Sequence, residues 1–181
     1  MKHLFAFIPV FLLIGCGAGT TTSDLRNFDL GIDAPGAKLP PVRIGPVRAA
    51  APFEATDMQY RLAYRNPAEI AAFAHSRWAA TPAELLRKQL LRAAGEGDGK
   101  CALGIEIQEF TQVFASTAES AARIELRIGL VAGSKVLSKQ VIVIESNAGA
   151  DAVSGAAALA RAADRAIGEI GGWVAAQPDC R

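Results

Sequence analysis

Residues 103–110 (LGIEIQEF) and 122–130 (ARIELRIGL) decide the fold of this 181-residue chain. Apolar residues occupy every second position in both stretches, and this period of two is typical of a strand with one buried face. The phase slips at Phe110, which indicates a β-bulge. Residues 132–134 (AGS) predict a tight turn into a further strand over residues 136–144, so this half of the chain is expected to be an antiparallel meander.

A long helix is expected to cover the meander. Residues 141–144 (VIVI) form an uninterrupted apolar run, which indicates a strand covered on both faces. Residues 150–174 carry an apolar stripe at helical spacing, with Arg165 and Glu169 outside it as an expected ion pair. The stripe consists of Val153, Ala156, Ala160, Ala163, Ile167, Ile170 and Val174.

A second helix is predicted to begin at residues 81–84 (TPAE). The threonine can cap the exposed amides, the proline suits the first turn, and the glutamate three residues after the cap completes a capping box. Leu86, Leu90 and Ala93 follow at helical spacing, and Gly95 is placed to end the helix.

Shorter strands are expected before this helix. Residues 25–31 (LRNFDLG) and 58–64 (MQYRLAY) both have strand character, and the second ends at an Asn-Pro turn signal. Residues 68–74 are alanine-rich enough for a helix, although a short partner strand is an equal alternative. The predicted fold class is therefore α/β: a single domain with a mostly antiparallel sheet meander packed by two main helices, as a layered sandwich.

The N-terminal segment is expected to be a signal peptide followed by a site of lipid attachment. Residues 4–14 are almost wholly apolar, which is too short for the roughly 20 residues of a membrane-spanning helix but suits the ~7–15 residues of a signal-peptide core. Residues 13–16 (LIGC) resemble a bacterial lipobox, in which Cys16 becomes the lipid-carrying mature N-terminus. The alternative is a chance cysteine behind an ordinary signal peptide.

This interpretation divides the chain into a lipoprotein signal peptide (1–15), a lipidated tether (16–24) and one domain (25–181). Acyl chains such as palmitate anchor a protein stably when more than one is present. Gly17 follows the cysteine where an Asp would resemble an inner-membrane retention signal, so we expect the periplasmic face of the outer membrane.

Charge and cysteine usage narrow the partners and the compartment. The 19 basic and 18 acidic residues come into balance when Lys2 is removed with the signal, so no basic field is available to collect nucleic acid. Cys101 and Cys180 are expected to form a disulfide in an oxidising compartment. Two unpaired thiols or a metal pair are the alternatives, and metal ligation has little support because His75 is the only mature histidine.

The mature sequence contains no nucleophile-elbow, zincin, P-loop or dinucleotide motif, so we expect no enzyme, no cofactor and no catalytic or metal site. A pair of catalytic carboxylates, as in a glycosidase, has no fixed spacing in the sequence, so this alternative is left open. Tyr60, Arg61, Arg77 and Trp78 are the candidate partner-binding residues. The alternative is that the aromatic residues lie in the core and the arginines are solvated or paired.

The order of features along the chain resembles the ABC-type transport auxiliary lipoprotein family, to which the PqiC-like lipoproteins belong. The similarity covers nearly the whole mature chain, although Phe28 stands where the family often has Tyr, and the two later cysteines are an addition. The matching features are the lipobox cysteine, NFDLG, LPPVRIGPV, MQYRLAYR, HSRWAATPAELLRKQL, and the meander with its closing helix.

The resemblance implies a non-enzymatic accessory or docking component, anchored at the outer membrane, of an MCE-type (mammalian cell entry) ABC transporter for intermembrane lipid transport. The implied partners are an MCE-type periplasmic protein and an ABC permease with its ATPase, and homo-oligomerisation is left open. A stand-alone structural or envelope-assembly lipoprotein is the alternative function.

Overall fold

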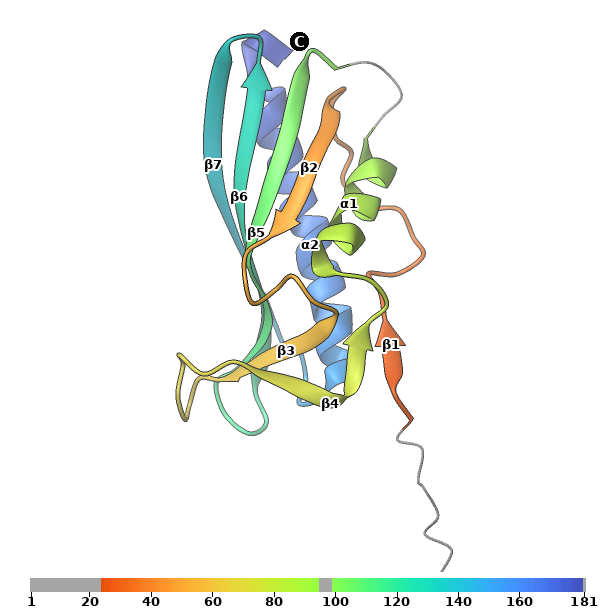
Figure 1. Cartoon of the computed structure of the whole chain (residues 1–181), viewed down its shortest axis with the longest axis vertical. Helices are drawn as coiled ribbons and strands as arrows, with labels where there is room; N and C mark the ends of the chain where they lie inside the picture. The colour runs from red at the N-terminus through yellow and green to blue at the C-terminus, as the bar shows by residue number, and fades with distance from the viewer. Residues whose placement is uncertain (1–23, 95–98, 181) are drawn as a thin grey trace, which may run out of the picture.

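The computed structural model describes residues 24–94 and 99–180, which form a seven-stranded sheet packed against two main helices (Figure 1). The helices are α1 (Pro82–Ala93) and α2 (Ala152–Ala175), and a short 3-10 helix, η1 (Pro178–Cys180), follows α2. The strands are β1 (Arg26–Phe28), β2 (Arg43–Ala49), β3 (Asp57–Leu62), β4 (Ala71–Trp78), β5 (Cys101–Phe114), β6 (Ser120–Ala132) and β7 (Lys135–Ser146).

The sheet is built around β5. Its order is β1-β4-β3-β5-β6-β7, and β2 is a second neighbour of β5 on the side that β3 also occupies. β5, β6 and β7 form an antiparallel meander, whereas β2 runs parallel to the first half of β5 and β3 parallel to its end. The predicted fold class, a single α/β domain with a mostly antiparallel sheet, is confirmed.

Local features of the sequence explain the register shift in β5, the turn between β6 and β7, and the positions of the shorter strands. The register of β5 against β6 shifts between Ile107 and Glu109, close to Phe110 where the apolar phase slips. β6 and β7 are joined by a tight turn in which Gly133 has a φ of 60°, a conformation that glycine adopts without steric cost. The predicted strand over residues 25–31 is present as β1, and residues 71–78 form β4, so the strand alternative is correct there.

Both helices have capped N-termini. Thr81 accepts a hydrogen bond from the backbone N–H of Glu84 at 3.3 Å, and the Glu84 carboxylate accepts from the backbone N–H of Thr81 at 3.0 Å, which confirms the predicted capping box. Hydrogen bonds from Thr81 lower the pKa of Glu84. α2 begins after Asp151, whose carboxylate accepts from the backbone N–H of Ser154 at 2.8 Å.

The hydrophobic core lies between the sheet and the helices. α2 runs along one face of β5, β6 and β7 (Figure 1). Alternate side chains of β6 point toward it and are fully buried, and they meet the buried stripe of α2. The fully buried positions of β6 are Ala122, Ile124, Leu126, Ile128 and Leu130.

Two expectations about this region are wrong. Val141 and Val143 are buried, but Ile144 is 49% exposed, because the helix covers only one face of β7. Arg165 contacts Glu145 of β7 at 2.8 Å and donates to the carbonyl of Ile144, so its partner is across the layers and not one turn along α2.

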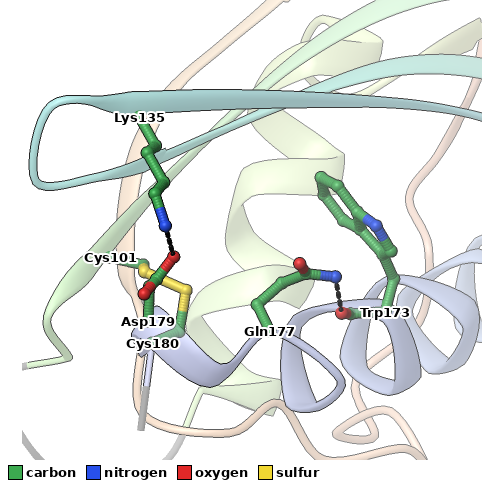
Figure 2. The surroundings of a disulfide bond; sticks show 6 residues. All are labelled: Cys101, Lys135, Trp173, Gln177, Asp179 and Cys180. Atoms are coloured by element: carbon green, nitrogen blue, oxygen red, sulfur yellow. Dashed lines mark hydrogen bonds and ion pairs between the residues drawn. A yellow bond between two sulfur atoms is a disulfide. The ribbon is translucent and has the colours of Figure 1, made fainter.

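The predicted disulfide joins Cys101 at the start of β5 to Cys180 in η1, with the two Cα atoms 5.2 Å apart (Figure 2). Lys135 at the start of β7 forms an ion pair with Asp179 at 2.7 Å beside it. The bond therefore fastens the chain that leaves α2 to the sheet that α2 covers.

Candidate docking surface on the open face of the sheet

The face of the sheet opposite α2 is not covered by another element of the described structure. The side chains that alternate with the buried positions of β6 point outward there, and the strand register places them beside outward residues of β5 and β7. We call this surface the open face. Its β6 positions are Ala121, Arg123, Glu125, Arg127, Gly129 and Val131.

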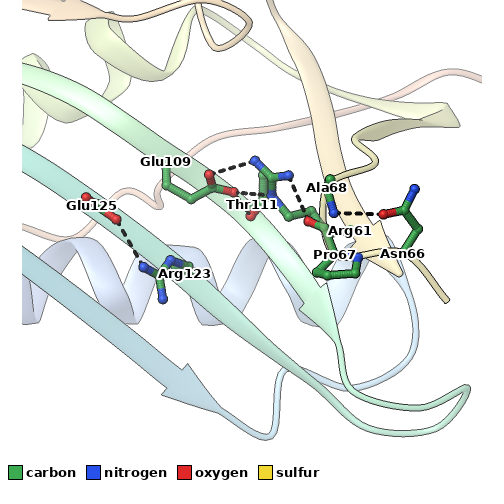
Figure 3. Close-up of polar contacts among 8 residues, drawn as sticks. All are labelled: Arg61, Asn66, Pro67, Ala68, Glu109, Thr111, Arg123 and Glu125. Carbon is green, nitrogen blue, oxygen red and sulfur yellow. Dashed lines mark hydrogen bonds and ion pairs between the residues drawn. The ribbon is translucent and has the colours of Figure 1, made fainter. Parts of the chain in front are cut away.

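The middle of the open face is polar and well ordered by hydrogen bonds (Figure 3). Arg61 of β3 donates from Nε and Nη2 to the two carboxylate oxygens of Glu109 at 2.8 and 2.9 Å, and the Thr111 hydroxyl donates to the same carboxylate at 2.6 Å. Arg123 pairs with Glu125 at 3.0 Å. The Arg61–Glu109 side chains are only 19% and 12% exposed, so this bidentate pair fixes β3 against β5 rather than presenting charge to a partner.

One hollow crosses the strands near the β6–β7 turn. It has a volume of about 400 Å³. Its floor includes Gly104, Gly129 and Ser138, which are neighbours in register across β5, β6 and β7. Val136 lies at its edge and is 73% exposed.

A second hollow lies near the β5–β6 turn, at the other end of the open face. Its volume is about 530 Å³, within the ~300–1,000 Å³ typical of small-molecule sites. Val113, Ala121 and Ile144 give it an apolar lining, and Arg123 stands at one side. The open face is thus polar in its middle and hollowed, with exposed apolar residues, at both ends.

The free edge of β7 is less suited to a partner than the open face. Lys139 points to the helix side of this edge strand, and Arg161 and Arg165 of α2 reach across to Glu145 at 3.2 and 2.8 Å. Arg165 also donates a hydrogen bond to the backbone carbonyl of Ile144. Charged side chains placed in this way obstruct the addition of another strand.

The four residues singled out in the sequence do not form one surface. Trp78 is 2% exposed and packs edge-on against Phe110 with ring centroids 5.4 Å apart, so it is a core residue and not a contact for a partner. Tyr60 is half-buried between aromatic rings, and Arg61 is held by Glu109. Arg77 on β4 is exposed. The alternative of core or core-edge aromatic residues with solvated or paired arginines therefore describes all four residues.

Sequence reasoning missed a row of charged residues on the open face. Arg48, Glu106 and Arg127 are neighbours across β2, β5 and β6, and the ion pairs found in residues 24–94 and 99–180 include none of them. The available signal was the alternation of β5 and β6, which places Glu106, Arg127 and the glycines on one face. The register that aligns them was not readable from the sequence.

No group of three or more metal-ligating side chains occurs among the described residues. Two carboxyl groups, Glu84 and Asp151, have a lowered pKa because they accept hydrogen bonds at helix N-termini. Both serve as caps and lie outside the open face. The described part of the open face carries salt-bridged carboxylates at Glu109 and Glu125 together with exposed apolar side chains.

The fold is one that solved structures share. The crystal structure of protein XCC0632 from Xanthomonas campestris, of the DUF330 family, is similar with a TM-score of 0.64 and 21% identity, over 83% of this chain and 91% of that chain. The crystal structure of an uncharacterized protein has a TM-score of 0.67 and 11% identity, over 83% and 98%. No family model and no curated protein match this chain. At these identities the likeness establishes the fold.

The structure does not describe the segment where a lipid anchor is expected. Cys16 and the rest of the expected signal peptide and tether up to residue 23 fall outside the described residues. Within the described part, neither helix has the length and apolarity needed to cross a membrane.

Proposed function

We propose that this protein is a non-enzymatic accessory of an MCE-type ABC transporter for intermembrane lipid transport. Lipid on Cys16 holds it at the periplasmic face of the outer membrane, and the open face of the sheet docks the MCE-type periplasmic partner. The permease and its ATPase supply the energy, so the domain itself needs no ATP site.

The observation that carries the proposal is the open face. An antiparallel sheet commonly leaves one face to solvent, so exposure alone would mean little. Here, however, Val131, Val136 and Ile144 are 43%, 73% and 49% exposed on that face, beside two hollows. Exposed apolar patches bordered by polar residues are typical of protein interaction sites.

The order of sequence features supports the transport assignment in particular. The family resemblance runs through the elements that build the sheet, from NFDLG in β1 to HSRWAATPAELLRKQL in β4 and α1. A lipid anchor and a docking face together suit a protein that positions a partner beside a membrane.

The test is photo-crosslinking in native membranes. A photo-reactive amino acid replaces Val136 on the open face of the full chain, and the matched control carries it at Leu91, which is 47% exposed on α1. We expect an adduct with an MCE-type protein from position 136 and none from position 91. An adduct with an outer-membrane barrel protein instead would favour the envelope-assembly alternative.

The anchor is tested in the same cells. Cys16→Ser should leave an uncleaved or soluble periplasmic form that is absent from the outer membrane, and it should abolish the crosslink from position 136, because the docking face is then no longer held at the outer membrane. A Cys16→Ser chain that is processed to the same size as the parent and fractionates with the outer membrane as the parent does contradicts the lipidation.

A further inference from the structure

The hollow near the β6–β7 turn is a groove that runs across the strands. Gly104, Gly129 and Ser138 stand side by side in register on its floor, and we call this hollow the cross-strand groove. An added Cβ at Gly129 would meet no atom within 4 Å, and one at Gly104 would make an ordinary contact of 3.7 Å with the Pro46 carbonyl. Packing therefore does not require these glycines. The floor consists of Pro46, Gly104, Gly129 and Ser138.

The two walls of the cross-strand groove differ in character. One wall is the row of Arg48, Glu106 and Arg127, which has an excess of positive charge and no ion pair among the described residues. The other wall is apolar, because Val136 lines it and its neighbour in register, Val131, is exposed beside it. A complementary ligand has carboxylates along one side and an apolar stripe along the other.

The dimensions fit a helix. The two walls stand four residues apart along the strands, which is about 13 Å at 3.3 Å per residue, and an α-helix with its side chains is about 10–12 Å across. The groove crosses four strands, or about 14 Å, which is close to nine helical residues. An extended peptide has no backbone partners here, since the floor strands β5 and β6 are paired on both sides.

We propose that the cross-strand groove binds an amphipathic α-helix of the partner protein, with its apolar stripe against Val131 and Val136 and its carboxylates toward Arg48 and Arg127. The two arginines are two strands apart, about 10 Å, and helix positions i and i+7 are separated by about 10.5 Å. Carboxylates one heptad apart therefore reach both arginines. The inference rests on the proposed docking function and specifies the segment that docks.

The first test uses synthetic helices and the mature full chain. One 14-residue peptide has a leucine stripe with Glu at i and i+7, and its control has Lys at the same two positions. We expect the Glu peptide to bind at least 10-fold more tightly by fluorescence anisotropy, and to weaken as salt screens the charges. Equal binding of the two peptides, or no binding of either, overturns the inference.

Variants assign the binding to the groove. Arg48→Glu with Arg127→Glu should reverse the preference toward the Lys peptide, whereas Arg87→Glu on the exposed side of α1 should leave it unchanged. Gly129→Val should remove binding of both peptides by filling the floor, with an unfolding midpoint no lower than the parent's. Retained Glu-peptide binding in both the double variant and Gly129→Val also overturns the inference.

A second measurement identifies the natural occupant. A photo-reactive residue at Ser138, on the groove floor, should crosslink in native membranes to a partner segment that is helical and carries acidic residues a heptad apart. An adduct with a lipid or with a second copy of this chain contradicts the helix. The docking function itself fails separately, if Val136 captures no MCE-type protein.

Discussion

The two faces of the β5–β6–β7 meander use the same strands for different purposes. On the covered face, Leu126 is fully buried against α2, whereas the next residue, Arg127, is exposed on the open face. Every second residue of β6 follows the same division. The covered face supplies the free energy of burial, and the open face is left with residues whose identity the core does not dictate.

Burial on one face and exposure on the other separate the residues that determine stability from those that are available for binding. A buried position in a close-packed core is restricted by volume, so its identity says little about function. Gly104 and Gly129 on the open face are not restricted in this way, because an added Cβ has room at both. Substitutions on the two faces should therefore have effects of very different size on unfolding.

The largest effect is expected where the covering layer is fastened to the sheet. The disulfide between Cys101 and Cys180 closes a loop with a sequence separation of 79 residues, and removing a crosslink of that span costs about 4.5 kcal/mol in the chain-entropy model. Replacing both cysteines by Ala should lower the free energy of unfolding, measured in urea, by roughly that amount. The reduced parent is the control and should behave alike; a variant as stable as the oxidised parent contradicts the fastening role.

The next prediction compares neighbouring residues on opposite faces. Leu126→Ala leaves a cavity beneath α2 and should cost about 3 kcal/mol, in the range of ~2–5 kcal/mol for buried leucines. Arg127→Ala, one residue along the same strand, should change stability by less than about 0.5 kcal/mol, since surface substitutions usually do. Chemical denaturation measures both. Losses of similar size would show that the open face is also part of the stabilising structure.

Much of this division was readable from the sequence. Alternation in residues 103–107 and 122–130 identified which side chains share a face, and the TPAE signal located the start of α1. The compartment expected from the N-terminus predicted the disulfide. These features depend on neighbours in the chain or on composition, which is why a single sequence sufficed.

The arrangement of segments that are distant in the chain could not be predicted from the sequence. The run 141–144 indicated burial on both faces, but β7 is an edge strand that a helix covers on one side, and its place in the sheet depends on long-range pairing. Trp78 was a binding candidate until β4 placed it against Phe110. Likewise, the cross-strand groove exists because the β5–β6 register sets Gly104 opposite Gly129.

A smaller effect is expected at the N-terminus of the covering helix. Ser154 donates to Asp151 from its backbone N–H and its hydroxyl, and these bonds lower the pKa of Asp151 below 3.8. Asp151→Ala should cost about 1 kcal/mol, as loss of an N-cap usually does. Asp151→Ala should lower the free energy of unfolding less than Leu126→Ala does, because the cap lies at the surface and the leucine is buried.

The pH dependence of this cap follows from the direction of the shift. A depressed pKa means that the ionised carboxylate stabilises the folded state, so its contribution is fully present above the unfolded pKa of about 3.8 and disappears as pH falls through the lower folded value. Asp151→Asn keeps a capping oxygen but no charge. The stability difference between parent and Asp151→Asn should be constant above about pH 5 and shrink below pH 4; a difference that grows on acidification contradicts the assignment.

The smallest effect on folding is expected at Gly129, on the open face. Valine favours strands, the backbone at Gly129 is extended, and nothing lies within 4 Å of the added Cβ. Gly129→Val should therefore leave the free energy of unfolding unchanged or raise it by up to about 1 kcal/mol. The matched control is Gly155→Val on α2, where an added Cβ would stand 1.9 Å from the Gln112 amide oxygen and must force the helix from the sheet. Thermal and urea unfolding distinguish them. If Gly129→Val destabilises the protein as much as Gly155→Val does, the glycine is required by the fold, and the division between a stabilising face and a binding face fails at the groove floor.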